Sequence, residues 1–316
     1  MISERPHPAA AAAERVAAFV VTYRRPVLLA DTLRGVLGQT HPPDAVIVIN
    51  NDAADDVRAR LAGEFPGVEV VDLASNEGSG GGFACALDLA ARLGYTWSWL
   101  LDDDSIPEPA SLEALLGALS HIRSAERPVA MAASTQLSPY GSFGGARWRH
   151  RIVVVPPVER SGSAPFSIDV AYWAGLMVHR SVMERIGLPR ADFFRCFADY
   201  EYCLRVRRAA MEIIAVPASR VAHHNGMYRT VTRLGRTSVR LVYSPSRHYY
   251  STRNEAYTAW RILRNPLAVF FHLTRQARLA LGDILHEDQR LRRLRLRALG
   301  TLDGLRGRLG QRGDLE

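Results

Sequence analysis

The sequence predicts an α/β fold with a mostly parallel sheet that carries helices on both faces. Three observations predict it. Short apolar runs alternate with amphipathic stretches from Val16 to Leu101, which is typical of repeated strand–helix–strand units. Polar residues follow the apolar runs, at the ends of strands where parallel sheets bind their ligands. A chain of 316 residues is also long enough to bury one substantial core and carry an appended element.

The first half of the chain contains the regular alternation. Strands are expected at residues 16–22, 45–50, 68–73 and 97–101, and helices at residues 26–38, 55–63 and 82–94. Pro26 suits the first turn of the first helix and Gly38 suits its end. Between them an apolar stripe recurs at helical spacing, formed by Leu28, Leu29, Leu33, Val36 and Leu37.

The second half is less regular. The pattern predicts a loop-rich stretch at residues 134–167, a strand at 168–179, a helix at 200–210, and a strand from Glu212 that ends at His223 and His224. Basic helices are expected beyond Asn225. One of them, at residues 266–286, has an apolar face formed by Leu267, Phe270, Phe271, Leu281, Ile284 and Leu285.

All 40 basic residues are arginine, and the chain contains no lysine. A Walker A phosphate loop and a protein kinase each need a lysine beside the phosphates. Schiff-base and pyridoxal enzymes need a lysine amine. The composition therefore excludes these enzyme classes.

The positive charge is concentrated at the C-terminal end. Residues 1–219 have a net charge of −4, whereas residues 220–316 hold 19 Arg against seven acids, a net charge of +12. Arginine and leucine are interleaved over residues 291–310, which favours an amphipathic helix on an anionic lipid surface. A solvated helix face is the alternative. Nucleic-acid binding is not expected, because aromatic stacking positions are missing among these arginines.

Three carboxylates, Asp102, Asp103 and Asp104, directly follow the expected strand at residues 97–101. Their mutual repulsion is costly unless a cation lies among them. Carboxylates combined with substrate phosphates are a common way of holding Mg²⁺ or Mn²⁺. A solvated acidic turn is the alternative, but the position at a strand end favours a metal site.

Other segments allow two interpretations each. The glycine-rich residues 76–83 form either a flexible turn or a phosphate cradle before a helix, and they do not fit the dinucleotide fingerprint. Asp199 and Glu201 lie at the start of an expected helix. They either cap that helix, or Asp199 acts as a general base. His223 and His224 are metal or phosphate ligands, or structural. Trp173 stacks on a sugar or belongs to the core.

These segments together resemble the family 2 glycosyltransferases. The resemblance covers residues 16–260 and is carried, in order, by FVVTYRRPVLL, INND, NEGSGGGF, LLDDDSIP, WAGLMVHR, FADYEYCLR, VAHH and YYSTRNEAY. It is most similar to bacterial galactofuranosyltransferases that begin cell-wall galactan on a polyprenyl-linked acceptor, with rhamnosyltransferases second. The family implies a GT-A fold and a divalent metal, Mn²⁺ or Mg²⁺.

The resemblance also implies roles for individual residues. Asp102, Asp104 and His223 would hold the metal, and Asp199 would be the catalytic base. Contacts to the nucleotide sugar would come from Thr22, Tyr23, Arg25, Asn50, Asn51, Asn76, Gly78, Asp102 and Asp103. Contacts to the acceptor are assigned to Trp173, Glu201 and His224. The family commonly has Asp at the position of Asn50, which leaves a nucleotide other than UDP open, and Ala198 replaces the first residue of an acidic pair.

We therefore expect an inverting transferase that moves a hexose, galactofuranose from UDP-galactofuranose, to a lipid-linked or glycan acceptor. A dTDP-rhamnose-dependent rhamnosyltransferase and a non-catalytic nucleotide- or glycan-binding protein are the alternatives. Residues 1–14 are expected to be a disordered leader, residues 15–225 the catalytic domain, and residues 226–316 a basic helical region. No segment is expected to span a bilayer. Three cysteines without CxxC spacing favour a reducing compartment, so a cytoplasmic enzyme on the inner membrane face is expected.

Overall fold

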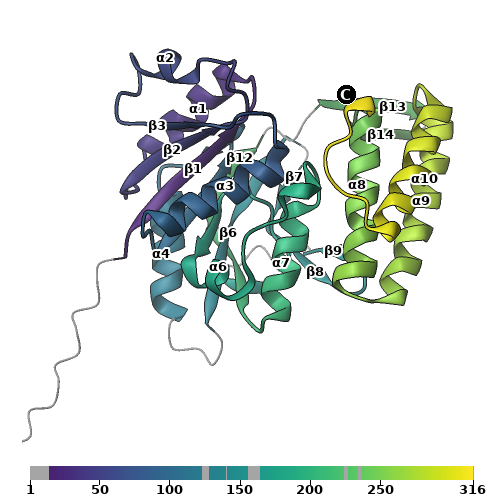
Figure 1. Cartoon of the computed structure of the whole chain (residues 1–316). Coiled ribbons are helices and arrows are strands. Elements are labelled where there is room, and N and C mark those ends of the chain that lie inside the picture. Colours follow the sequence, from purple (N-terminus) through teal and green to yellow (C-terminus); the bar gives the residue numbers. More distant parts are fainter. Residues whose placement is uncertain are drawn as a thin grey trace, which may run out of the picture.

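A mixed sheet occupies most of the first two thirds of the chain, and three long helices stand beside it (Figure 1). The computed structural model describes residues 14–122, 128–139, 141–155, 164–223, 227–233 and 236–315. The expected leader falls almost entirely outside these residues.

The parallel half of the sheet follows the predicted alternation. Its strands are β1 (Val16–Thr22), β2 (Ala45–Asn50), β3 (Glu69–Asp72) and β4 (Trp97–Asp102), in the spatial order β4-β1-β2-β3. The connecting helices are α1 (Pro26–Leu37), α2 (Val57–Leu61) and α3 (Gly78–Arg92). Alternate residues of β1 enter two separate cores, Phe19 packing with α3 on one face and Val20 with α1 on the other. The apolar strands are therefore buried on both faces, as parallel strands require.

The second half adds strands of both directions. They are β5 (Ser105–Pro107), β6 (Val129–Ser138), β7 (Gly141–Phe143), β10 (Phe166–Ile168), β11 (Leu176–His179) and β12 (Glu212–His223). β11 runs antiparallel to both β4 and β6, whereas β12 runs parallel to β6. The single strand expected at residues 168–179 is wrong, because it is two strands separated by a loop. Gly175 ends that loop with a positive φ of 80°, so that the chain re-enters the sheet beside Ser134.

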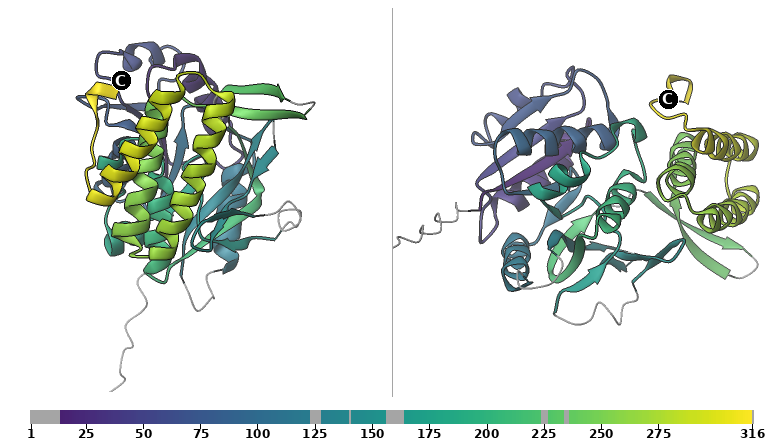
Figure 2. Two further views of the ribbon diagram at one scale, coloured as in Figure 1. Left: turned by 90° about the vertical axis from the view of Figure 1, so that its right-hand side faces the viewer. Right: turned by 60° about the horizontal axis from the view of Figure 1, so that its bottom comes forward.

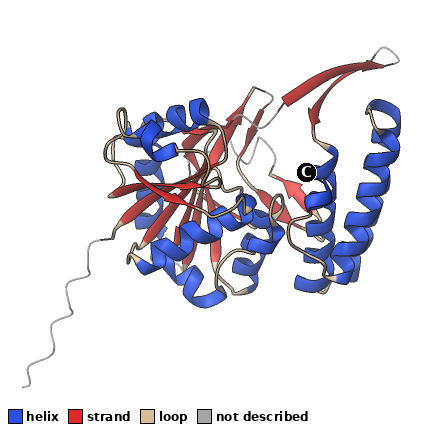
Figure 3. Ribbon diagram, turned by 45° about the horizontal axis from the view of Figure 1, so that its top comes forward, coloured by secondary structure: helices blue, strands red, loops and turns tan. Residues whose placement is uncertain are grey.

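Helices cover both faces of this half as well (Figure 3). They are α4 (Ser111–Ile122), α6 (Arg180–Ile186), the 3₁₀ turn η1 (Ala191–Phe193) and α7 (Ala198–Arg208). α4 packs in the same core as α1, and α6 and α7 pack in the same core as α3. A small hairpin, β8 (Ala146–Trp148) with β9 (Ile152–Val154), lies outside the main sheet.

The C-terminal region starts with strands before it becomes helical. A hairpin of β13 (Met227–Arg233) and β14 (Arg236–Val242) precedes the helices, which the basic-helix expectation did not include. It is followed by α8 (Pro245–Tyr257), the π-helical turn η2 (Thr258–Ile262), α9 (Pro266–His286), α10 (Arg290–Arg306) and the short turn η3 (Gly313–Leu315). Figures 1 and 2 agree that α8 is the helix nearest the sheet.

The arginines of α10 are not all placed as expected for an amphipathic helix on a lipid surface. Arg293 and Arg297 are buried against α8 and α9. The Nε of Arg297 donates to Asp283 Oδ2 at 2.6 Å, and its Nη2 lies 2.8 Å from His248 Nδ1. Burial lowers the pKa of His248 to about 4, with the adjacent arginines adding to the effect, so the imidazole stays neutral and its Nδ1 can accept the bond from Arg297. Part of the arginine pattern therefore holds the three helices together instead of facing a lipid surface.

Two glycines bring α10 into backbone contact with α8. A Cβ at Gly300 would lie 2.6 Å from Tyr249 O, and one at Gly304 would lie 2.2 Å from Arg253 O. Glycine at these two positions allows a helix separation that no larger residue permits.

Gly304→Ala is expected to lower the free energy of unfolding by about 1–3 kcal/mol, the usual effect of overpacking. The methyl group would push α10 away from α8 and break the contacts between them. Thermal unfolding followed by circular dichroism measures the loss. Gly117→Ala in α4 is the matched control, because a Cβ there meets no atom within 4 Å. If the two variants unfold at the same temperature, the close approach does not contribute to stability.

Candidate active site

The ends of three strands meet at one edge of the sheet. β1 and β4 end side by side, and β5, which directly follows the aspartate triplet, pairs antiparallel with β12 so that Ser105 lies opposite His223. This register brings Asp102, Asp104 and His223 together, with one ligand atom of each within 4.8 Å of the others. His223 Nε2 lies 3.1 Å from Asp104 Oδ1 and 4.0 Å from Asp102 Oδ2.

The third aspartate of the triplet points elsewhere. Asp103 is buried and accepts hydrogen bonds from Thr22 Oγ1 at 2.9 Å, from the Tyr23 N–H at 3.3 Å and from Arg25 Nη1 at 3.1 Å. The same Arg25 nitrogen lies 3.1 Å from Asp104 Oδ2. Thr22, Tyr23 and Arg25, which were predicted to contact the nucleotide sugar, thus lie beside the aspartates. Here they fix the turn after β4, and Arg25 offsets part of its negative charge.

The cluster carries more negative charge than its surroundings favour. Burial raises the pKa of Asp102, and the adjacent carboxylates add to the shift. Burial acts in the same direction on Asp104, but its hydrogen bond with His223 and the charges of His223 and Arg25 outweigh it and lower its pKa. The pKa of His223 is raised, since the bond to Asp104 and the charge of Asp102 exceed the effect of burial. Positive charge between these carboxylates, from a proton on His223 or from a divalent cation, therefore stabilises the cluster.

The three side chains suit a divalent metal. Two carboxylates and one imidazole form a donor set that Mn²⁺ accepts, and Mg²⁺ accepts the carboxylates. The spacing within 4.8 Å leaves the ligand atoms close enough to share one ion.

Asp199 lies at the start of α7, outside this cluster. One of its oxygens accepts the Tyr200 N–H at 2.9 Å. Burial raises the pKa of Asp199 to about 7, and the charge of Asp102 contributes to this rise, so the two carboxylates lie within electrostatic reach of each other. A carboxylate with a pKa near neutrality and no metal to bind is suited to take up a proton.

Arg247 on α8 is a site residue that the sequence reasoning missed. Its positive charge acts on both Asp102 and Asp199, and its side chain hydrogen-bonds the Cys196 thiol. The guanidinium also stacks on the ring of Tyr243 at 4.5 Å. Nothing in the sequence distinguishes this arginine from the 39 others, since its role depends on where α8 packs.

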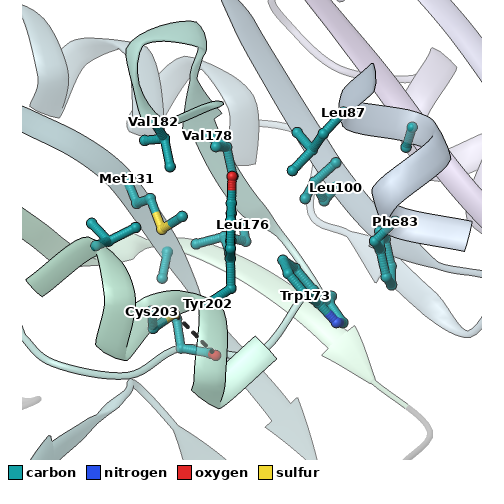
Figure 4. Packing of buried hydrophobic residues seen from close by; sticks show 14 of the residues in the cluster. Phe83, Leu87, Leu100, Met131, Trp173, Leu176, Val178, Val182, Tyr202 and Cys203 are labelled. Atoms are coloured by element: carbon teal, nitrogen blue, oxygen red, sulfur yellow. Dashed lines mark hydrogen bonds between the residues drawn. The ribbon is translucent and has the colours of Figure 1, made fainter. Parts of the chain in front are cut away.

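Two residues assigned to the acceptor belong to the interior. Trp173 is 4% exposed, stacks on Phe83 and packs against Tyr202, so it offers no ring face to a sugar (Figure 4). Glu201 is fully buried and pairs with Arg205, Oε1 to Nε at 2.6 Å. Both are therefore structural in this conformation. His224, the third candidate, lies outside the described residues.

The two asparagines predicted to contact the nucleotide sugar, Asn50 and Asn51, also form hydrogen bonds within the protein. The Asn50 amide donates to the Asp52 and Asp55 carbonyls and to Asp72 Oδ1, at 2.8–2.9 Å. Asn51 donates to the Gly78 carbonyl at 3.2 Å. They shape the loop after β2 and leave Asp52 beside Arg24 at the surface.

A shallow groove of about 460 Å³ lies at this edge of the sheet. It is lined by Arg24, Pro26, Asp52, Ala54, Asp55 and Arg60. Asp52 is one of the polar residues expected at the strand ends, but it was not assigned a contact to the nucleotide sugar. It directly follows Asn50 and Asn51 in the same INND segment, which was the available signal.

The glycine-rich segment forms the first turns of α3. Gly78 has a positive φ of 66° and its N–H donates to Asn76 Oδ1 at 2.9 Å. The N–H of Gly80 donates to the Phe194 carbonyl at 2.9 Å. These N–H groups are satisfied within the protein, and the glycines serve close packing of α3 on residues 190–194. The phosphate-cradle interpretation is therefore not supported by this geometry.

Within the part of the chain that the structure describes, no helix combines the length and the apolar composition needed to cross a bilayer.

Known structures share this architecture. The UDP complex of residues 1–349 of Staphylococcus aureus TarS superposes with a TM-score of 0.57 at 12% identity, covering 92% of this chain and 89% of that one. A mannosyltransferase of Pyrobaculum calidifontis, solved with GDP-mannose and Mn²⁺, superposes with a TM-score of 0.52 at 15% identity, covering 92% and 87%. The fold is the GT-A fold that the resemblance implied.

Sequence relatives agree with the fold. A Mycolicibacterium smegmatis protein, galactofuranosyltransferase GlfT1, is 26% identical over 249 residues, which cover 77% of this chain and 82% of the relative. The dTDP-rhamnosyl transferase RfbF of Shigella flexneri is 28% identical over 159 residues, covering 47% and 49%. Residues 13–244 match the family described as glycosyltransferase like family 2. The chain is thus an enzyme that belongs to glycosyltransferase family 2.

Proposed function

We propose that this chain is an inverting, metal-dependent hexosyltransferase that moves galactofuranose from UDP-galactofuranose to a hydroxyl of a lipid-linked or glycan acceptor. The observation that carries the proposal is the separation of two kinds of carboxylate. Asp102 and Asp104 lie with His223 in a cluster suited to a cation, whereas Asp199 lies outside it with a pKa of about 7.

Each group has a distinct task in this reaction. When bound, Mn²⁺ or Mg²⁺ supplies the charge that stabilises the departing diphosphate. Asp102, Asp104 and His223 would hold it at the ends of β4 and β12. Asp199 removes the proton from the acceptor hydroxyl as that oxygen attacks the anomeric carbon, and the nucleoside diphosphate leaves from the opposite face. A single displacement of this kind inverts the anomeric centre.

The donor proposal is supported by the similarity to a galactofuranosyltransferase over most of both chains. A dTDP-rhamnose-dependent activity is the second candidate. Two observations favour it, namely the shorter match to a rhamnosyl transferase and Ala198 in place of the first acidic residue before the base.

A panel of nucleotide sugars tests the proposal. The purified chain is incubated with each donor and Mn²⁺ or Mg²⁺, with and without a polyprenyl-linked disaccharide, and nucleoside diphosphate release is measured. Acceptor-dependent release from UDP-galactofuranose supports the first candidate, and release from dTDP-rhamnose supports the second. Nucleotide binding without turnover of any donor would indicate a non-catalytic binding protein.

We also propose that α9 attaches the enzyme to the inner face of the cell membrane. Six large apolar side chains on this helix are 41–57% exposed: Leu267, Phe270, Leu273, Leu281, Ile284 and Leu285. Exposed arginine accompanies them at position 278. An exposed apolar stripe beside positive charge suits the surface of an anionic bilayer.

Replacing Phe270 and Leu281 together by Glu is expected to reduce binding to phosphatidylglycerol vesicles by about tenfold or more. The reason is that two exposed apolar side chains that would enter the bilayer are lost, and two negative charges that the anionic lipids repel are added. Vesicle co-sedimentation measures the binding, and donor hydrolysis in solution is expected to remain unchanged. Leu37→Glu combined with Leu93→Glu is the matched control, because these residues are 45% exposed on the sheet domain. Equal binding by both double variants would contradict the α9 surface.

A further inference from the structure

The five residues before α7 form an unusually strained segment, which we call the base loop (residues 193–197). Three of them have a positive φ although none is glycine: Phe194 at 62°, Cys196 at 64° and Phe197 at 69°. Bulky side chains rarely adopt this conformation because Cβ clashes with the backbone. Such a segment persists only if its surroundings hold it, and it ends two residues before Asp199.

Two adjacent side chains of α8 supply many of the hydrogen bonds that stabilise this conformation. The Asn254 amide nitrogen lies 3.0 Å from the Phe193 carbonyl oxygen, 3.0 Å from that of Arg195 and 2.8 Å from that of Cys196. An amide has two hydrogens, so the three carbonyls share them. Arg253 Nη2 donates to the Phe193 carbonyl at 3.0 Å.

Arg253 also orients its neighbour. Its Nε donates to Asn254 Oδ1 at 2.8 Å, which leaves the Asn254 nitrogen facing the base loop. Its Nη1 donates to the Gly310 carbonyl at 2.5 Å, and the Gly310 N–H donates to the Asp192 carbonyl at 2.7 Å. Both side chains are completely buried. Because unpaired buried polar groups are costly, this network specifies one arrangement of α8 and the loop.

The opposite side of the loop rests on α3. The Phe194 carbonyl, which Asn254 does not reach, accepts the Gly80 N–H. A Cβ at Gly78 would lie 2.0 Å from the same carbonyl oxygen, so glycine is required there. Every backbone carbonyl from residue 192 to residue 196 therefore has a donor from α3, from α8 or from Gly310.

From these contacts we infer that Asn254 and Arg253 are positioning residues, which hold the base loop in its strained form and thereby place Asp199 for proton removal. This inference rests on the proposed function of Asp199. It assigns a role to the YYSTRNEAY segment, whose RN pair lies on α8 and does not itself reach the metal cluster.

Asn254→Ala tests the inference with two independent measurements. Hydrogen exchange of peptides covering residues 193–203 is expected to become faster, since the loop loses its donors. The kcat is expected to fall by about 10- to 100-fold, because a displacement of an ångström at a catalytic group has effects of this size. The KM for the donor is expected to stay within about twofold, as the loop takes no part in the metal cluster.

Thr252→Val is the matched control. Thr252 is buried on the same helix but donates to Gln276 Oε1 on α9, so its removal costs a buried hydrogen bond without touching the loop. It is expected to lower thermal stability while leaving kcat and loop exchange as in the parent. If Asn254→Ala does not fold, Asn254→Ser keeps one donor and is expected to show the same effects at smaller amplitude.

The outcomes separate the two claims. Parental exchange and parental kcat in a folded Asn254 variant would overturn the inference. Equal loss of kcat in Asn254→Ala and Thr252→Val would also overturn it, because it would show a general effect of stability. If Asn254→Ala shows faster exchange at the loop but the parent chain itself turns over no donor, the contacts between α8 and the loop are upheld and the proposed function is refuted instead.

Discussion

Asp104→Ala is expected to lower transfer by roughly 10³-fold or more, since a lost metal removes several kcal/mol of transition-state stabilisation. Asp104 contacts both His223 and Arg25, at 3.1 Å each. Removing it takes a ligand from the metal cluster while Asp103 remains to pair with Arg25. The measurement is nucleoside diphosphate release at saturating donor, with circular dichroism to confirm the fold.

Chelation provides the complementary test. Excess EDTA is expected to abolish release in the parent chain, and added Mn²⁺ is expected to restore it. Asp31→Ala is the control, because the Asp31 side chain is 41% exposed and pairs with Arg34, not with a residue of the cluster. Full activity in excess chelator would remove the metal from the proposed function.

Asp199→Asn is expected to reduce kcat by about 10² to 10⁴-fold while the donor still binds. Asparagine keeps the size of the side chain and its hydrogen bond to the Tyr200 N–H, but it cannot accept a proton from the acceptor. Donor binding is measured by calorimetry and turnover by product formation. Turnover within a few fold of the parent would show that Asp199 is only a helix cap. A retained anomeric configuration, determined by NMR of the new linkage, would contradict the single displacement.

The pH dependence follows from the same residue. Burial raises the pKa of Asp199 to about 7, and the base works only when ionised. Below this pKa the carboxyl is protonated and inactive, so kcat is expected to rise with pH through about 7. Asp199→Asn is expected to lose this limb. Glu201→Gln is the control, since it breaks the buried pair with Arg205 and lowers stability without moving the limb.

The parallel half of the sheet was predictable because its pattern is local. Each strand is buried on both faces and each helix presents one apolar stripe, so periodicity alone identifies them. The proximity of the candidate metal ligands was predictable for a related reason. Asp102 and His223 both end strands, and strand ends gather at one edge of a sheet.

Side-chain direction at that edge was not predictable. Asp103 turns away from its two neighbours because Thr22 and Arg25 offer it hydrogen bonds. Asn50 and Asn51 face the loop after β2 for the same reason. An aromatic such as Trp173 beside a strand is consistent with a sugar platform or a core residue, and only the position of Phe83 on α3 decides between them.

Contacts across long sequence separations were outside the reach of pattern reasoning. Asn254 and the base loop are 58–61 residues apart, and neither segment has a periodicity that points to the other. Arg247 is likewise placed by the packing of α8. Asn254 lies in a segment that carries the family resemblance, and Arg247 is one of 40 arginines. Their roles can be assigned only from their contacts in the structure.

Because residues of α8 stabilise the base loop, the parts of the site become complete at different times during synthesis of the chain. The sheet and the metal cluster are complete once His223 has been made, but Asn254 follows the base loop by about 60 residues. At roughly 5–20 residues per second, synthesis from His223 to Asn254 takes about 2–6 seconds, during which the candidate metal ligands have been made but the base loop still lacks Asn254. The Gly310 contact forms later still. Placement of the proposed base would therefore wait for the synthesis of α8, and a fragment released before Pro245 would retain the sheet without the α8 contacts that hold the base loop.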